Sequence, residues 1–441
     1  MRPPPLTFTL PPGACPPPAQ LFPTFAARPG CVFLDTALPS ASARHSILAC
    51  EPSLVLRGGP EILPRLRAEL AARVCARIPG LPFVGGAIGY LGYEYGAALE
   101  RIPSPAPDDL GLPDLAFGFY DTALVHDHTS GITTLVAPDA AALAHLRALV
   151  TAPRSTLSAR DSPPYSVGPL TPDLSPAAYA AALARIRAYI AAGDTYQVNF
   201  THRFTAPFSG SAAALYTRLR ALSPAPHAAF FDFGDFQLVS STPERLLRVA
   251  KRTLETRPIK GTVARLSDPA ADAAQRAALL ASAKDHAELL MIVDLARNDL
   301  GRVATPGSVH VASRHDLETY STVHHLVATV RAELAEGLDR FDALRALHPG
   351  GSITGAPKIR AMQIIAELEP ARRHVYTGSL GYLGYDGDAD LAIAIRTITC
   401  ARGRASYHVG GGITWDSDPT AEYEETLHKG RAMHQALTTS A

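Results

Sequence analysis

The sequence predicts a mixed α and β protein with a large hydrophobic core, and three features of the 441 residues support this prediction. Hydrophobic residues make up 47% of the chain and charged residues 19%, as is typical of a soluble globular protein. Short apolar runs broken by glycine predict strands and tight turns in the first half. Helical and strand periodicities both occur in the second half. The length allows one large domain or two to three ordinary ones.

The first half of the chain predicts an irregular arm followed by short strands. Residues 1 to about 20 are rich in proline and are expected to lack regular structure, whereas the apolar runs 31–34 and 83–90 predict strands. A second proline- and serine-rich stretch, 153–176, is the best boundary candidate. We therefore expect an N-terminal region, residues 1–165, and a C-terminal region, residues 166–441.

The segment after this boundary predicts a helix. Ser175 suits the N-cap, Pro176 suits the first helical position, and Gly193 ends the pattern. Apolar side chains recur at spacings of four, three and four residues, which places them on one helix face: Tyr179, Leu183, Ile186 and Ile190.

The next segment, residues 196–201, alternates as a strand does. One predicted face carries Tyr196, Val198 and Phe200, and the other carries only polar side chains: Gln197, Asn199 and Thr201. A polar strand face in an otherwise apolar protein indicates a binding site.

Composition narrows the class of protein. The chain has 41 lysine and arginine residues and 41 aspartate and glutamate residues. Its net charge is therefore zero, and no overall charge attracts nucleic acid or an anionic membrane. The five cysteines are odd in number and show no CxxC spacing, which favours a reduced cytoplasm. No apolar run approaches the ~20 residues that span a bilayer, and the proline-rich N-terminus does not resemble a signal peptide. We expect a cytoplasmic protein.

Lys260 lies between Ile259 and Gly261 and is a candidate nucleophile. A lysine amine titrates near ~10.4, so it attacks carbon at neutral pH only where desolvation or a neighbouring cation favours its neutral form. Apolar Ile259 and small Gly261 are compatible with such a site. Taken alone, Lys260 could equally be a strand-end side chain that reaches solvent.

Two acidic pairs are candidate metal ligands. Asp285 with Glu288, and Glu422 with Glu425, are each three residues apart in segments predicted to be helical, so each pair projects from one helix face. Two such faces that converge would form an oxygen-only site suited to Mg²⁺. Each pair alone could be a solvated helix face.

Gly410, Gly411 and Gly412 follow a probable strand over residues 405–409. Glycine backbone can approach a substrate carboxylate closely, although an ordinary glycine turn would give the same pattern. Lys429 is four residues beyond Glu425, so it could form an ion pair with Glu425 or bind a second carboxylate.

Together, seven ordered motifs identify the chain as a member of the chorismate-utilising enzymes, and within that family it most resembles the aminodeoxychorismate synthases. The motifs are GDTYQVN at 193–199, STPER at 241–245, PIKGT at 258–262, DLARND at 294–299, GAPK at 355–358, AIRT at 394–397 and EYEET at 422–426. The match from about residue 170 onward marks 166–441 as the chorismate-binding catalytic region.

The N-terminal region, 1–165, resembles anthranilate synthase component I more loosely, through FLDT at 33–36 and RHSIL at 44–48. In relatives this region forms a pocket for tryptophan. Relatives usually carry Glu-Ser where this chain has Asp35-Thr36, so a tryptophan site is not carried over to this chain from the resemblance.

Two positions indicate the branch of the family. Relatives that add water to chorismate tend to have a lysine base at the position of Gln197, and glutamine cannot deprotonate water. Anthranilate synthases usually have alanine at the position of Lys260, whereas the aminodeoxychorismate branch has lysine. The prediction is therefore a transferase that aminates C4 of chorismate for 4-aminobenzoate and folate biosynthesis.

Anthranilate synthase component I is the alternative to this prediction. A non-catalytic chorismate-binding module is a distant third, because candidates for the acid, the nucleophile and the metal ligands are all present.

The resemblance implies a double displacement on the chorismate ring. Neutral Lys260 attacks C2 while Glu244 protonates the departing C4 hydroxyl, and ammonia then enters at C4 and expels the lysine. No cysteine has the Gly-x-Cys-x-Gly context of a glutaminase nucleophile, so a separate glutaminase subunit is the expected partner.

The resemblance also implies the remaining site residues and the fold. Glu288 and Glu425 would hold Mg²⁺ on the ring carboxylate, with Glu422 and the shorter Asp285 acting directly or through water. Substrate-binding and active-site positions matched to the family are Gln197, Gly261, Thr262, His325, Thr354, Tyr382, Arg396, Gly410, Gly411, Gly412 and Lys429; Tyr382 and Arg396 would bind the enolpyruvyl carboxylate. The implied fold is α+β, with two antiparallel β-sheets packed as a sandwich and helices outside.

Overall fold

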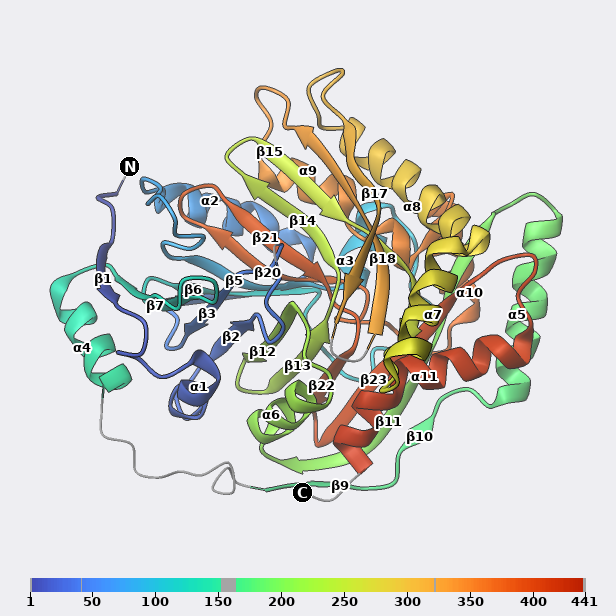
Figure 1. Cartoon of the computed structure of the whole chain (residues 1–441), viewed down its shortest axis with the longest axis horizontal. Coiled ribbons are helices and arrows are strands. Elements are labelled where there is room, and N and C mark those ends of the chain that lie inside the picture. The colour runs from blue at the N-terminus through green and yellow to red at the C-terminus, as the bar shows by residue number, and fades with distance from the viewer. Residues whose placement is uncertain (1, 41, 152–163, 321–322, 439–441) are drawn as a thin grey trace.

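Two antiparallel sheets form the centre of the molecule, and helices cover their outer faces (Figure 1). The computed structural model describes residues 2–40, 42–151, 164–320 and 323–438. Within these residues the first sheet has 13 strands and the second has 10. The predicted sandwich of two antiparallel sheets is confirmed.

The first sheet runs in the order β1 (Leu6–Leu10), β8 (Thr133–Ala137), β7 (Ala123–Asp127), β3 (His45–Ala49), β2 (Val32–Asp35), β12 (His227–Asp232), β13 (Phe236–Thr242), β22 (Thr397–Ala401), β23 (Arg404–Ile413), β11 (Gln197–Gly210) and β10 (Thr171–Pro172). Two short strands also pair with β11: β9 (Tyr165–Val167) and β19 (Gly355–Ala356).

The second sheet runs in the order β16 (Ile259–Ala264), β18 (Val323–Glu333), β15 (Thr253–Arg257), β14 (Arg245–Ala250), β21 (Ala389–Ile393), β20 (Ser379–Gly384), β5 (Gly86–Leu91), β6 (Leu115–Tyr120) and β4 (Leu54–Gly58), and β17 (His310–Thr319) pairs with β18.

Helices pack on both sheets. Those that pack on the first sheet are α1 (Pro18–Ala26), α4 (Ala140–Thr151), α5 (Pro176–Ala191), α6 (Ala212–Leu222), α10 (Lys358–Leu368) and α11 (Pro419–Thr438). Those that pack on the second are α7 (Pro269–Ala281), α8 (Ala283–Gly301) and α9 (Arg340–Leu347). The remaining elements are α2 (Leu63–Ala72), α3 (Tyr93–Leu99) and the 3₁₀ turns η1 (Pro60–Ile62) and η2 (Gly351–Ile353).

The core lies in three layers, as a sandwich requires. The central layer joins the two sheets, for example through Val32 and Phe231 of the first and Ile88 and Leu380 of the second. Two further clusters fill the space between the first sheet and its helices, and another does so for the second sheet. None of the described helices combines the length and apolar composition that crossing a membrane requires.

Both predicted regions contribute strands to both sheets. β2 pairs with β12, and β5 pairs with β20, so strands from before residue 165 lie directly beside later ones. Residues 152–163, which include much of the predicted boundary stretch, lie outside the described residues. The division at residue 165 stays a prediction about sequence organisation.

The predicted helix after the boundary is confirmed as α5. The Ser175 side chain accepts a hydrogen bond from the Ala178 amide at 3.2 Å, and Tyr179, Leu183 and Ile186 are buried. Gly193, at φ +81°, lies just beyond the helix end. The predicted strand after it is the start of β11, which continues to Gly210 because β23 pairs along most of its length.

Two local predictions were wrong. The N-terminal arm is not irregular throughout, because β1 pairs with β8 and α1 begins at Pro18. The glycines 410–412 do not follow the strand but belong to it, since β23 runs from Arg404 to Ile413 and pairs with β11. Both errors concern strand pairing between distant segments, which local periodicity does not reveal.

Candidate active site

Lys260 lies on β16 next to a break in strand register. It pairs with Leu326 of β18, and the register shifts between Lys260 and Thr262. Gly261 at this shift has φ +71°, a conformation that favours glycine. A methyl group at Gly261 would lie 3.1 Å from Cβ and Cγ of Asp285, so α8 packs directly against this bulge. Glycine here therefore both permits the bulge and lets α8 approach.

Burial lowers the pKa of Lys260 below its ordinary value. Glu288 opposes this shift, Lys429 reinforces it, and Glu244 and Glu425 oppose it more weakly. The net lowering means that the neutral amine needed for nucleophilic attack is more abundant than for a solvated lysine.

Glu244 lies where the chain passes from β13 of the first sheet to β14 of the second. It is 4% exposed. Its Oε1 accepts a hydrogen bond from Ser352 Oγ at 2.7 Å and a longer one from the Ile259 amide at 3.4 Å. Burial raises the pKa of Glu244 to about 7, although Ser352, Lys260 and the Ile259 amide act against it. A carboxyl group in this state can donate a proton near neutral pH.

Gln197 and Lys260 meet at Gly412. On the paired strands β11 and β23, a methyl group added to Gly412 would lie 2.2 Å from Gln197 Nε2 and 3.4 Å from Lys260 Nζ. Gln197 is fully buried, and neither its Nε2 nor its Oε1 has a hydrogen-bond partner among the described residues. A buried amide without partners is costly, so it marks a place where a ligand or water completes the structure.

Helix α11 lies directly over the other two glycines. Lys429 Nζ donates to the Gly410 carbonyl at 3.1 Å and forms an ion pair with Glu425 at 2.6 Å. A methyl group at Gly411 would lie 3.1 Å from Glu422 Oε2. The glycines of β23 thus bring its backbone close to the charged face of α11.

The four predicted metal ligands come from the two helices that border Lys260. Glu288 on α8 and Glu425 on α11 both act electrostatically on Lys260, Asp285 contacts the Gly261 bulge, and Glu422 accepts a hydrogen bond from Ser417 Oγ at 2.7 Å. Within the described ranges, no three acidic, histidine or cysteine side chains are grouped closely enough to hold a metal ion together. The donors are nevertheless all carboxylate oxygens, the chemistry that suits Mg²⁺.

The two α11 carboxylates differ in their environments. Burial raises the pKa of Glu422, with Glu425 adding to the effect. Burial acts on Glu425 in the same direction, but the ion pair with Lys429 outweighs it and lowers the pKa of Glu425 overall. Glu425 is therefore the more strongly ionised of the two.

His325 and Thr262 face each other across β16 and β18. Thr262 Oγ1 lies 2.7 Å from His325 Nδ1, while His325 Nε2 is buried with no partner among the described residues. Burial lowers the pKa of His325 to about 3, and Arg396 contributes to the lowering. The imidazole is therefore neutral at pH 7, with one ring nitrogen available to a ligand.

Arg396 and Thr354 were predicted from the family resemblance. Arg396 has φ +49°, and its carbonyl accepts a hydrogen bond from the Ser241 amide at 3.1 Å. Its guanidinium has no hydrogen bond or ion pair within the described residues, which leaves it available to an anion. Thr354 is fully buried, and its hydroxyl donates to the Gly350 carbonyl at 2.9 Å, so it supports a turn of the backbone.

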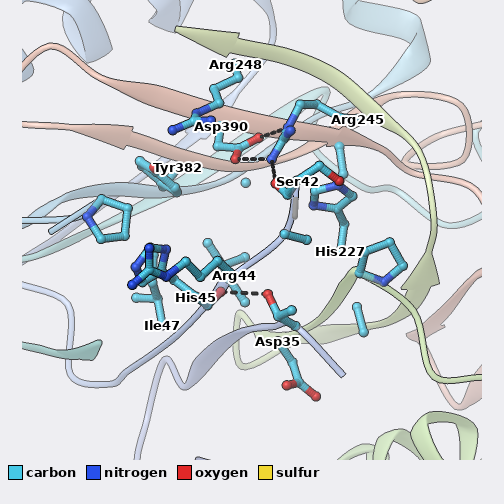
Figure 2. Close-up of a pocket in the computed structure, with 18 of the residues that line it drawn as sticks. Asp35, Ser42, Arg44, His45, Ile47, His227, Arg245, Arg248, Tyr382 and Asp390 are labelled. Carbon is cyan, nitrogen blue, oxygen red and sulfur yellow. Dashed lines mark hydrogen bonds and ion pairs between the residues drawn. The ribbon is translucent and has the colours of Figure 1, made fainter. Parts of the chain in front are cut away.

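Tyr382, predicted to bind the enolpyruvyl carboxylate, lines a cavity that contains none of the other predicted site residues, and its assignment stays a prediction. This separate cavity has a volume of about 310 Å³ and is shown in Figure 2. There, Arg245 donates to both oxygens of Asp390, at 2.8 and 2.9 Å, and to the Ser42 carbonyl at 2.7 Å. The Tyr382 ring packs edge-on against Phe83. On β20 its side chain points into the space between the sheets, a direction that the motif alone did not specify.

Ser352 was missed by the sequence analysis. It lies in η2, two residues before Thr354, and its hydroxyl contacts Glu244. Its sequence context, between the glycines at 350–351 and the GAPK motif at 355–358, was available. The contact with Glu244 was not, because the two residues are 108 positions apart.

Comparison with known proteins identifies the family. The family described as chorismate binding enzyme matches residues 39–435, so the chain belongs to that family, as the motifs predicted. Aminodeoxychorismate synthase component 1 from Klebsiella aerogenes is 45% identical over 360 residues, which cover 81% of this chain and 78% of the relative.

Anthranilate synthases are nearly as similar. Component 1 from Streptomyces coelicolor (strain ATCC BAA-471 / A3(2) / M145) is 43% identical over 414 residues, which cover 90% of this chain and 81% of the relative. The crystal structure of anthranilate synthase component I from Streptococcus pneumoniae TIGR4 superposes with a TM-score of 0.78 at 33% identity, covering 90% of this chain and 93% of that one. Overall identity thus leaves the choice between the two activities to the site residues.

Proposed function

We propose that this chain is an aminodeoxychorismate synthase component 1. It would replace the C4 hydroxyl of chorismate with an amino group from ammonia, giving 4-amino-4-deoxychorismate for 4-aminobenzoate and folate biosynthesis. One observation carries the proposal: Lys260, whose pKa is lowered by burial, lies beside Gly412 and the unpartnered amide of Gln197. This is the environment that a lysine nucleophile needs.

In the proposed reaction, the Lys260 amine forms a bond to C2 of the ring. The ring double bonds shift, the C4–O bond breaks, and Glu244 supplies the proton with which the hydroxyl leaves as water. Ammonia then bonds to C4, the double bonds shift back, and the C2–N bond to Lys260 breaks. Covalent catalysis divides one difficult substitution into two, and the proton from Glu244 avoids the expulsion of hydroxide, which is a poor leaving group.

The two groups act in opposite protonation states. Lys260 must be neutral, and its lowered pKa extends that state to lower pH. Glu244 must be protonated, and its pKa of about 7 keeps it so to higher pH than an ordinary glutamate. Turnover should therefore fall on the acid side as Lys260 gains a proton and on the alkaline side as Glu244 loses one.

Magnesium forms a second part of the proposal. Glu288 and Glu425 would hold Mg²⁺, with Glu422 and Asp285 assisting directly or through water. The ion would supply positive charge to the ring carboxylate of the substrate, which four acidic side chains would otherwise repel.

The other residues around Lys260 would bind the two ends of chorismate. Arg396 suits the enolpyruvyl carboxylate, because a guanidinium can bind both carboxylate oxygens. Neutral His325 would act beside the ring. The ring-carboxylate end would contact Gly261, Thr262, Gly410, Gly411, Gly412 and Lys429.

We propose that a separate glutaminase subunit supplies the ammonia in the cytoplasm. None of the five cysteines has the sequence context of a glutaminase nucleophile. Cys31, Cys50, Cys75 and Cys400 are free thiols, three of them buried, which suits a reducing compartment. The purified chain alone should therefore use ammonium salts and not glutamine.

Product analysis tests the activity. Purified chain with chorismate, Mg²⁺ and ammonium at mildly alkaline pH should give 4-amino-4-deoxychorismate by mass spectrometry, with no pyruvate in a coupled assay. Accumulation of anthranilate with stoichiometric pyruvate would instead identify an anthranilate synthase, the activity of the relatives at 43% identity. Absence of any turnover would favour a non-catalytic chorismate-binding module.

Two further experiments test the covalent step and the source of ammonia. Full C4 amination by a Lys260→Ala variant would contradict the covalent step while leaving the activity intact. Glutamine-dependent turnover by the purified chain would contradict the need for a glutaminase partner.

A further inference from the structure

Oε1 of Glu244 accepts hydrogen bonds from two donors. Ser352 Oγ lies at 2.7 Å and the Ile259 main-chain nitrogen at 3.4 Å. A backbone N–H can only donate, so Oε1 must keep a lone pair for it in either protonation state. A serine hydroxyl can rotate, and beside an oxygen that is already an acceptor it donates as well.

This geometry distinguishes the two oxygens of the neutral carboxyl group. If Oε1 carried the proton, the two donors would face a hydroxyl oxygen, which is a weaker acceptor than the carbonyl oxygen. With the proton on Oε2, both donors are satisfied and Oε2 is left to deliver the proton.

The turn that carries Ser352 is held from two sides. The Thr354 hydroxyl donates to the Gly350 carbonyl at 2.9 Å, which closes the backbone around η2. Arg373 Nη1 donates to the Ile353 carbonyl at 2.9 Å. Ser352 itself is 7% exposed, so its hydroxyl is held beside Glu244 and away from solvent.

The charged groups around Glu244 do not replace the hydrogen bond from Ser352. Lys260 on β16 favours the ionised form of Glu244 through its charge, and among the described residues no hydrogen bond joins it to the carboxyl group. Asp299 of α8 lines the small cavity behind Glu244, but it is paired with Lys358 at 2.6 Å. Arg245, the next residue in the chain, turns away to Asp390 and Glu255.

We propose that Ser352 is a positioning residue: with the Ile259 amide it reserves Oε1 of Glu244 as an acceptor and places the acid proton on Oε2. The proposal rests on the proposed function in one respect, namely that Glu244 is the acid that protonates the leaving hydroxyl. Ser352 would act only through Glu244 and would not touch the substrate.

A matched pair of variants isolates the hydroxyl. Threonine and valine have nearly the same shape, so the two variants add the same bulk beside the cavity of about 20 Å³ that Ser352 and Glu244 both line. Ser352→Thr keeps the donor and should retain kcat. Ser352→Val should lower kcat by about tenfold or more, with a much smaller change in KM, because a hydrogen bond to a catalytic carboxyl group is lost.

Infrared spectroscopy detects the protonated carboxyl group of Glu244 directly, and this measurement does not require turnover. The protonated-carboxyl C=O band that disappears in Glu244→Gln belongs to this residue. In Ser352→Val the band should move to higher frequency, because the carbonyl oxygen loses a donor. Its titration midpoint should move to higher pH, because the ionised form loses a stabilising hydrogen bond. The alkaline limb of the kcat profile should move in the same direction.

Opposite outcomes overturn the proposal. An unchanged band in Ser352→Val would show that the hydroxyl does not bond to Glu244. A midpoint at lower pH would show that Oε1 carries the proton and donates to Ser352. Full turnover by Glu244→Gln would remove Glu244 from the proposed reaction, and the infrared result would still decide whether Ser352 orients its proton.

Discussion

At the scale of single residues, Gly412 shows how a missing side chain makes the site. Lys260 comes from the second sheet and Gln197 from the first, and their polar ends meet where Gly412 has only hydrogen. Lys260, the proposed nucleophile, and a buried amide can approach each other here because Gly412 has no side chain. Gly412 therefore shapes the site through the volume it leaves open.

We predict that Gly412→Ala disables catalysis without unfolding the chain. The new methyl carbon would stand 2.2 Å from Gln197 Nε2, so the amide must move, and it would press on Lys260 Nζ at 3.4 Å. Because displacements of about 1 Å can reduce rates about 100-fold, kcat should fall by roughly that factor. Steady-state kinetics and thermal melting measure the two effects.

Gly301→Ala is the matched control for this prediction. Nothing lies within 4 Å of a methyl group at that position, so turnover should stay near the parent value. Equal rates in Gly412→Ala and Gly301→Ala would show that the space beside Gly412 is not used.

At the scale of elements, helices α8 and α11 determine the charge around Lys260. Ser282 caps α8 by accepting a hydrogen bond from the Asp285 amide at 3.2 Å, which fixes the first turn of α8 against the Gly261 bulge. Lys429 ties α11 to β23 through the Gly410 carbonyl. Glu288 of α8 and Glu425 of α11 both act electrostatically on Lys260.

Removal of Mg²⁺ should abolish turnover, since uncompensated carboxylates would repel a dicarboxylate substrate. Excess chelator should stop the reaction and added Mg²⁺ should restore it. A Glu288→Ala/Glu425→Ala double variant should need far more Mg²⁺ and should lose Mg²⁺ binding in titration calorimetry.

Glu424→Ala is the control for the magnesium prediction, because Glu424 is an exposed neighbour of Glu425 on the same helix. It should leave the Mg²⁺ requirement unchanged. Undiminished activity of the parent chain in excess chelator would rule out the metal.

At the scale of the whole molecule, a buried ion pair ties the active-site segments together. Arg373 donates to the Asn199 carbonyl of β11 at 2.6 Å and to the Ile353 carbonyl of η2 at 2.9 Å. Its partner Glu369 accepts from Arg373 Nε at 2.8 Å and from the Thr201 amide at 2.9 Å. The strand of Gln197 and the turn of Ser352 are therefore held in one network.

Arg373→Met should lower the free energy of unfolding by about 3–5 kcal/mol, because it leaves Glu369 buried without its counter-charge. Denaturant unfolding followed by circular dichroism measures this loss. Arg372→Met is the adjacent control. The Arg372 side chain is 29% exposed, reaches Asp108 only at 3.8 Å and donates one hydrogen bond, to the Ala106 carbonyl at 2.9 Å, so the cost should be about 1 kcal/mol. Equal losses in the two variants would contradict the role of the buried network.

The sequence by itself determined the family, the nucleophile candidate and the local elements with strong signals. Helix α5 was predictable because its cap, its apolar spacing and its terminal glycine all lie within one short segment. The motifs around Glu244, Lys260 and Arg396 were predictable because their residue types follow one another directly in the chain.

Only the tertiary structure decided how these pieces meet. Strand β1 and the glycines of β23 depend on partners far along the chain, and the direction of Tyr382 depends on which face of β20 points between the sheets. The contact of Ser352 with Glu244 joins residues 108 positions apart. Periodicity and motifs describe neighbours in sequence, whereas strand pairing and buried hydrogen bonds depend on closing long loops, which no local pattern encodes.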